Sequence, residues 1–217
     1  MSYDSTTPDD MAVTAARLGP DARASMISVY ALKPGFQNLL RPAVGRLSAW
    51  GVTPNQITLL ACALSVLLGI ALTFGNRRLG VLLPVFLPVR MALNAIDGML
   101  ARRTNQQTRL GAVLNELTDV VSDAALTLPF AYVANPLGVG AAIFFAALTE
   151  MAGLVGMGER RYQGPFGKSD RAVALGVCGG WLALGWPVSY VARDWLPVGW
   201  VLLCGITIWN RGRAYAQ

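Results

Sequence analysis

Long apolar segments, separated by short polar ones, fill the sequence from residue 57 to residue 213. A helix needs about 20 residues to cross the roughly 30 Å of hydrocarbon in a bilayer. Six segments approach or exceed that length, although the last is short: Ile57–Phe74, Gly80–Leu100, Leu110–Ala134, Leu137–Met157, Ala172–Val191 and Leu196–Trp209. The pattern predicts an all-α integral membrane protein with a six-helix transmembrane domain over residues 57–213.

The N-terminal part has a different pattern. Residues 1–30 are polar and contain proline, which predicts a mobile cytoplasmic tail. Residues 31–56 are predicted to form an interfacial helix and its connector. Apolar residues recur there at helical spacing, with Arg41 and Arg46 between them: Phe36, Leu39, Leu40, Ala43, Val44 and Leu47. This pattern is typical of an amphipathic helix in the membrane interface, and an ordinary packed helix is the alternative.

The basic residues fall mainly on one side of the predicted helices. That side carries Arg41, Arg46, Arg102, Arg103, Arg109, Arg160, Arg161, Lys168, Arg171, Arg211 and Arg213, and the other carries Arg77, Arg78 and Arg193. By the positive-inside rule, both termini are cytoplasmic, and the polar loops 101–109 and 158–171 face the cytosol.

Composition narrows the classes of function. At 54% hydrophobic and 14% charged residues, the chain is too apolar for an ordinary soluble domain, in which about a quarter of residues are charged. Histidine is absent, which excludes histidine-based triads and zinc–histidine sites. The three cysteines lie far apart in apolar segments, so no disulfide framework is expected. Because the net charge of +6 resides largely at helix ends, it does not indicate a nucleic-acid partner.

Ionisable residues inside the second and third predicted spans are the candidates for chemistry. Such groups are unfavourable in a membrane by several kcal/mol unless they are paired or hydrated. Asn94 and Asp97 are i, i+3 neighbours, and Asn115, Asp119 and Asp123 repeat at i, i+4 on one helix face. Oxygen ligands without histidine or cysteine suit a hard cation, Mg²⁺ or Mn²⁺. Two alternatives are carboxylates held only by arginines (Arg90, Arg102, Arg109) and a proton or cation pathway.

The spacing of these residues is the strongest signal. It runs Asn94-x2-Asp97-Gly98-x2-Ala101-Arg102-x8-Gly111-x3-Asn115-x3-Asp119. This resembles the signature of the CDP-alcohol phosphotransferase (CDP-alcohol phosphatidyltransferase) family, with six identical residues and two asparagines in place of aspartates. The Gly51-Val52-Thr53-Pro54-Asn55 stretch before the first span is also similar, so the resemblance covers roughly residues 33–213. The stretch after Arg90 is similar to a YnbA-like bacterial branch of the family.

The resemblance implies a transferase that releases CMP while moving a phosphatidyl group from CDP-diacylglycerol to a small alcohol or sugar phosphate, in phospholipid biosynthesis. It implies one or two Mg²⁺ or Mn²⁺ ions at Asn94, Asp97, Asn115 and Asp119, with Asp119 also the catalytic base. Nucleotide contacts would come from Gly98, Ala101, Arg102 and Gly111. The asparagines lack negative charge, and Glu116 and Asp123 are the acids placed to compensate.

The second predicted site is the loop Gly164–Arg171. Basic residues beside glycines at a helix start suit a phosphate. Lys168 and Arg171, with Arg109 on the same side, are therefore the predicted acceptor-phosphate site. Positive-inside topology and contact with lipid headgroups form the alternative interpretation.

Two other functions are compatible with the sequence. One is transfer of a phospho-alcohol from a CDP-alcohol to a lipid hydroxyl, and the other is a non-catalytic membrane subunit that binds CDP-lipid. The resemblance further implies membrane lipids as partners, a homodimer, and a location in the bacterial inner membrane with the active site facing the cytosol.

Overall fold

The computed structural model describes residues 33–154 and 164–213, and all regular secondary structure in those ranges is helical. The predicted tail over residues 1–30 lies outside them. The chain divides into two compact units, residues 1–45 and 46–217. Helix α3 (Lys33–Ala49) confirms the helix predicted before the first span, and its membrane-interface location stays a prediction.

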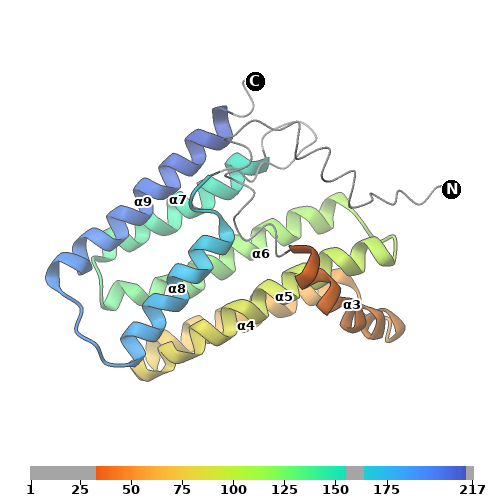
Figure 1. Ribbon diagram of the computed structural model, residues 1–217, viewed down its shortest axis with the longest axis horizontal. Helices are drawn as coiled ribbons and strands as arrows, with labels where there is room; N and C mark the ends of the chain where they lie inside the picture. The colour runs from red at the N-terminus through yellow and green to blue at the C-terminus, as the bar shows by residue number, and fades with distance from the viewer. Residues whose placement is uncertain (1–32, 155–163, 214–217) are drawn as a thin grey trace. The chain divides into compact units, whose positions relative to one another are not determined.

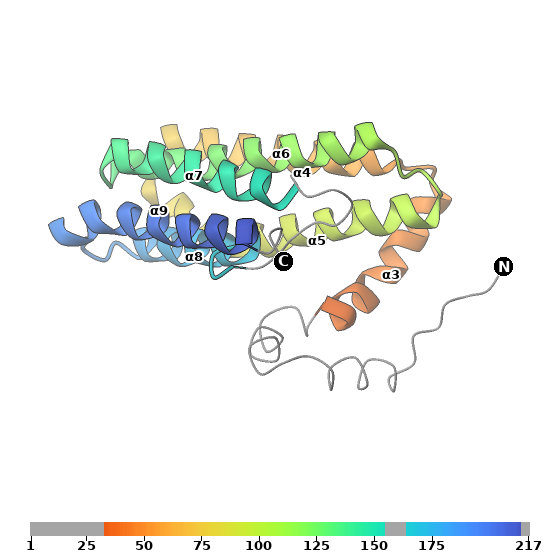
Figure 2. The ribbon, with the colours of Figure 1, turned by 90° about the horizontal axis from the view of Figure 1, so that it is seen from above.

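The second unit contains a bundle of antiparallel helices (Figures 1 and 2). Its elements are α4 (Pro54–Phe74), η2 (Arg77–Val81), α5 (Leu82–Arg103), α6 (Arg109–Thr127), η3 (Leu128–Tyr132), α7 (Pro136–Leu154), α8 (Lys168–Ala183) and α9 (Tyr190–Arg213). Successive α-helices run in alternating directions, and the α5–α6 hairpin extends beyond the start of α8. The start of α8 therefore meets α6 partway along its length rather than at its end.

Capping residues fix where α4 and α6 begin. Thr53 caps α4 in a capping box, in which its hydroxyl accepts from the Gln56 N–H and the Gln56 side chain accepts from the Thr53 N–H. Thr108 caps α6 by accepting from the Gly111 N–H at 2.9 Å. Both caps lie at the same end of the bundle, so they fix the helix ends between which the site forms.

The predicted limits of the last two helices are wrong. The fifth was expected over Ala172–Val191, yet α8 runs from Lys168 to Ala183. Gly185 follows with a φ of +75°, a left-handed conformation that ends a helix, and Pro187 prevents its continuation. Helix α9 consequently begins at Tyr190, six residues before its predicted start.

Four helical segments are long and apolar enough to cross a membrane: Pro54–Phe74, Arg77–Arg103, Pro136–Gly153 and Tyr190–Arg213. Of the other two predicted spans, α6 carries several ionisable residues and α8 has 16 residues. The count of six spans and the placement of the termini therefore stay predictions. Large apolar side chains point outward along α4, among them Leu59, Leu67, Ile70 and Phe74, as lipid-facing helices require.

Helices α4 and α6 approach closely at Gly69. A Cβ atom there would lie 2.3 Å from the backbone oxygen of Ala125, so Gly69→Ala must push the two helices apart. We expect this variant to lose about 1–3 kcal/mol of stability, the usual effect of overpacking. Thermal unfolding in detergent measures it, with Gly140→Ala as control because no atom lies within 4 Å of that position. Equal midpoints for the two variants would contradict the predicted close packing.

Candidate active site

A cavity of about 250 Å³ lies between the start of α4 and the α5–α6 hairpin. Six residues of the predicted signature line it: Asp97, Gly98, Ala101, Arg102, Gly111 and Asn115. Helix α5 contributes the first four of these residues and helix α6 the other two. The structure thus gathers all four predicted nucleotide contacts and two of the four predicted metal ligands around one space.

Helix α4 and the hairpin turn add residues that the sequence analysis missed. Asn55 and Thr58 line the cavity from α4, and Gln106, Gln107 and Thr108 line it from the turn. The Thr58 hydroxyl donates a hydrogen bond to Asp97 Oδ2 at 2.8 Å. Both residues are buried, so Thr58 fixes the orientation of the carboxylate. The sequence signal for this contact was Thr58 itself, a polar residue near the start of the first predicted span.

Small residues keep the cavity open. A Cβ atom at Gly98 would meet Arg102 Nη1 at 3.6 Å, so the guanidinium lies over this glycine. A Cβ atom at Gly111 would lie 3.0 Å from Thr108 Oγ1 and 3.3 Å from Asn55 Oδ1. Larger side chains at either glycine would enter the space that the cavity offers to a ligand.

Asp119 lies outside this cavity lining, in a cluster of charged residues. It is 5% exposed, and its Oδ1 atom accepts from Asn94 Nδ2 at 2.8 Å and from Arg90 Nη2 at 3.3 Å. The Lys168 ammonium forms an ion pair with the other oxygen, Oδ2. Two predicted metal-binding residues, Asn94 and Asp119, are therefore hydrogen-bonded to each other.

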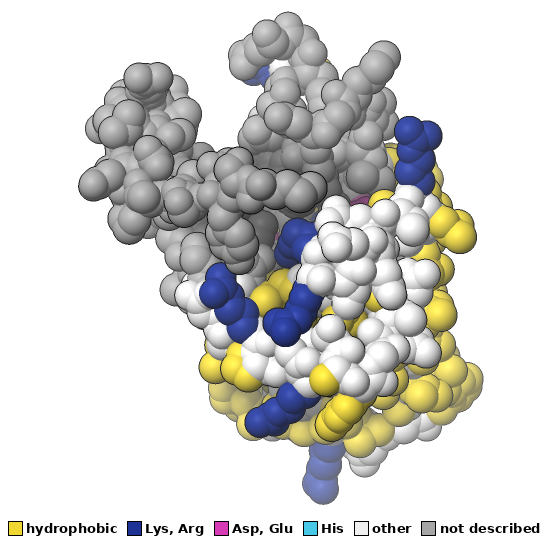
Figure 3. Space-filling model, turned by 90° about the vertical axis from the view of Figure 1, so that its right-hand side faces the viewer, with side chains coloured by type: hydrophobic (Ala, Val, Ile, Leu, Met, Phe, Trp, Pro, Cys, Tyr) yellow, Lys and Arg dark blue, Asp and Glu magenta, His cyan; other side chains and the backbone are white. Residues whose placement is uncertain are grey.

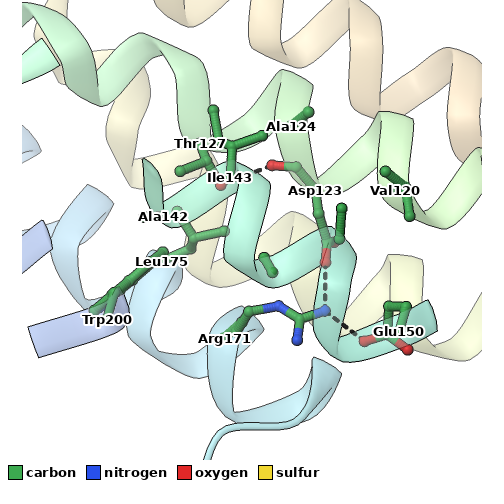
Figure 4. A pocket seen from close by; sticks show the side chains of 12 residues that line it. Val120, Asp123, Ala124, Thr127, Ala142, Ile143, Glu150, Arg171, Leu175 and Trp200 are labelled. Atoms are coloured by element: carbon green, nitrogen blue, oxygen red, sulfur yellow. Dashed lines mark hydrogen bonds and ion pairs between the residues drawn. The ribbon is translucent and has the colours of Figure 1, made fainter. Parts of the chain in front are cut away.

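Arg171 extends this cluster from α6 to α7, as Figure 4 shows. Its Nη2 atom lies 2.9 Å from Asp123 Oδ2 and 2.7 Å from Glu150 Oε1, and Nη1 donates to Thr149 Oγ1 at 3.0 Å. The second oxygen of Asp123 pairs with Arg90 Nη1 at 2.6 Å. Arginines thus hold both oxygens of Asp123. Glu150 was missed, although an acid inside the fourth predicted span was a visible signal.

The predicted acceptor-phosphate residues separate into two places. Lys168 and Arg171 reach acids one turn apart on α6, whereas Arg109 begins α6, ten residues before Asp119 and so about 15 Å away along the axis. Figure 3 shows Lys and Arg side chains standing out from the face that it presents. Arg102, Arg103 and Arg109, around the connection between α5 and α6, are among the exposed arginines. Glu116 is half-buried on α6 and does not line the cavity.

Asn115 supplies the test of whether a metal ion fits. Its Oδ1 atom is buried and has no hydrogen-bond partner, and it lines the same cavity as Asp97. A carboxylate and an amide oxygen are ligands for one hard divalent cation. No group of three acidic or cysteine side chains suited to a metal occurs within residues 33–154 and 164–213. An ion at the cavity would therefore depend on Asp97, Asn115 and water or substrate oxygens.

Comparison with known proteins agrees with this geometry. The CDP-alcohol phosphatidyltransferase family profile matches residues 51–206. The inner membrane protein YnbA of Escherichia coli is 46% identical, over 79% of this chain and 94% of YnbA. Archaetidylinositol phosphate synthase of Pyrococcus horikoshii is 30% identical, over 44% of this chain and 49% of that enzyme.

Phosphatidylinositol phosphate synthase of Mycobacterium tuberculosis, solved with CDP-DAG bound, has the same fold. The two structures match with a TM-score of 0.61 at 20% identity, over 79% of this chain and 89% of that one. The apolar helices and the inner-membrane relative identify an integral membrane protein. Together with the match over residues 51–206, they show that the chain belongs to the CDP-alcohol phosphatidyltransferase family, in its YnbA-like branch.

Proposed function

We propose that this chain transfers a phosphatidyl group from CDP-diacylglycerol to a small alcohol or sugar phosphate and releases CMP. The observation that carries the proposal is the cavity lined by six signature residues, Asp97, Gly98, Ala101, Arg102, Gly111 and Asn115. CDP-DAG is bound in the M. tuberculosis structure of the same fold. The reaction would take place in the bacterial inner membrane, at the end of the bundle predicted to face the cytosol.

The cavity has the groups that a nucleotide pyrophosphate needs. Arg102 supplies a positive charge over Gly98, and the small residues let the ligand approach the helix backbone. Enzymes of this family generally use divalent metal ions. Asp97 and Asn115 would hold such an ion, which would neutralise the pyrophosphate and stabilise the departing CMP.

The charged cluster would bind and deprotonate the acceptor. Asp119 would take the proton from the attacking hydroxyl at Oδ2, because Oδ1 already accepts from Asn94 and Arg90, whereas Lys168 is the one partner that the described residues give Oδ2. Lys168 has a side chain that is 26% exposed, which leaves its ammonium accessible to an acceptor phosphate. Arg171 supports the same region through Asp123 and Glu150. A phosphorylated acceptor also agrees with the name of the P. horikoshii relative, archaetidylinositol phosphate synthase.

The proposal is tested by measuring CMP release from the purified full chain in detergent micelles. The reaction contains CDP-diacylglycerol, Mg²⁺ or Mn²⁺, and a pool of alcohols and sugar phosphates. We expect CMP release that requires an acceptor and falls to background in EDTA. Asp97 is the one carboxylate among the described residues that line the cavity, and without a metal ion it cannot help to neutralise the pyrophosphate. Full activity in EDTA would contradict the proposed metal at Asp97 and Asn115.

A non-catalytic subunit that binds CDP-lipid is the second candidate. It is favoured by Asn94, which donates to Asp119 at 2.8 Å instead of contributing a carboxylate. Such a protein would bind CDP-diacylglycerol but release no CMP with any acceptor or metal. The CMP measurement, combined with a binding measurement on the same preparation, separates the two candidates.

A further inference from the structure

We infer that the Lys168 ammonium takes, beside Asp119, the place of a second divalent cation, so that the site uses one metal ion and one lysine. The inference rests on the proposed function and specifies how its active site is charged. It concerns an ammonium that arrives from α8 at an acid on α6, 49 residues earlier in the sequence.

The hydrogen bonds of Asp119 argue against a metal at this carboxylate. Its Oδ1 atom already faces Asn94 Nδ2 at 2.8 Å and Arg90 Nη2 at 3.3 Å, and Oδ2 faces Lys168 Nζ. The reverse orientation of the Asn94 amide would set two acceptor oxygens against each other, so the carboxylate selects the N–H side. Asn94 therefore presents a donor where a metal ligand would have to present oxygen.

Charge balance leads to the same conclusion. Ion pairs connect three cations with three carboxylates in one series: Lys168, Asp119, Arg90, Asp123, Arg171 and Glu150. The formal charges of these six residues cancel, and all but Lys168 have side chains at most 15% exposed. Arg211, which is 3% exposed and donates to the carbonyl oxygen of Thr149 next to Glu150, adds a further buried cation. A divalent ion added at Asp119 would leave this poorly solvated cluster with excess positive charge beside Arg90 and Lys168. Removal of Lys168 would instead leave a net negative charge that attracts a cation.

The position of Lys168 also suits this role. It begins α8, where the helix dipole disfavours a cation unless an acid compensates it, and Asp119 does so. An ammonium has three N–H donors, so Lys168 can contact Asp119 and still donate to phosphate oxygens. It can thus connect the acid and a substrate phosphate, which is the electrostatic task of a bridging cation.

The test counts Mn²⁺ ions bound to the full chain in detergent micelles, with free Mn²⁺ measured by its EPR signal. We expect the unsubstituted chain to saturate at about one ion and Lys168→Met at about two, because loss of the ammonium opens Asp119 Oδ2 to a cation while Arg90 stays at Oδ1. Lys168→Arg keeps the charge and should stay at about one. Arg78→Met, an exposed cation lost elsewhere, is the matched control and should also stay at about one.

Saturation of the unsubstituted chain at about two ions, or of Lys168→Met at about one, would overturn the inference. A folded state for Lys168→Met is verified by its thermal unfolding transition. If it does not fold, Lys168→Gln, a smaller neutral residue, takes its place in the same titration. The number of bound ions does not depend on turnover. If the unsubstituted chain binds two ions and releases CMP, the inference fails and the proposed function stands. If it binds one ion and releases no CMP, the proposed function fails and the inference stands.

Discussion

Asp97→Asn is expected to lower CMP release, as kcat/KM for CDP-diacylglycerol, by about 10³-fold or more. Among the described residues that line the cavity, Asp97 carries the sole carboxylate, so the variant removes the negative charge that would hold the metal ion. A loss of this size corresponds to about 4 kcal/mol of transition-state stabilisation. Initial rates of CMP release over a range of lipid concentrations measure it.

The substitution is chosen to spare the fold. An asparagine oxygen can still accept the hydrogen bond from Thr58, which reaches Asp97 at 2.8 Å. Asp194→Asn is the matched control, because Asp194 is an exposed acid on α9. Retention of a tenth or more of the activity by folded Asp97→Asn would argue against its metal-binding role.

Arg171→Met is expected to give the largest loss of stability, about 3–5 kcal/mol. Arg171 is 3% exposed and pairs with both Asp123 and Glu150, so the variant removes a buried cation that two buried carboxylates share. Unfolding of the detergent-solubilised chain, followed by circular dichroism against temperature or denaturant, measures the change. Because the cluster joins α6, α7 and α8, we expect the loss to affect the whole bundle.

Two further variants sharpen this prediction. Arg103→Met removes an exposed arginine from the last turn of α5 and should change stability by at most about 0.5 kcal/mol. Arg171→Met combined with Glu150→Gln should be more stable than Arg171→Met alone, because the second substitution removes one of the two buried negative charges that Arg171 balances. If Arg171→Met and Arg103→Met have the same unfolding midpoint, the ion pairs of Arg171 do not stabilise the bundle.

Much of the cavity was predictable because its residues follow helical spacing. Asp97, Gly98 and Ala101 share a face of α5, Gly111 and Asn115 share a face of α6, and a five-residue connection holds the end of α5 near the start of α6. The helical class and the core of each apolar segment followed from the length and hydrophobicity of those segments. Short-range rules sufficed for these features.

Contacts between distant segments were not predictable by those rules. Thr58 meets Asp97 across 39 residues, and Lys168 meets Asp119 across 49. Periodicity places a side chain on a helix face but does not specify which other helix that face meets. For this reason the hydrogen bond between Asn94 and Asp119, beside α8, was not foreseen, and their metal-binding role stays a prediction. The helix end before Gly185 was missed because apolar residues continue past it.

The identity of the lipid product tests the central proposal most directly. CDP-diacylglycerol with isotopically labelled acyl chains is incubated with the full chain, Mn²⁺ and one acceptor, and the labelled lipids are analysed by mass spectrometry. We predict a labelled phosphatidyl lipid that contains the acceptor, formed in equal amount to CMP. Recovery of all labelled CDP-diacylglycerol unchanged, although it binds, would contradict the account and favour a non-catalytic or CDP-alcohol-dependent role.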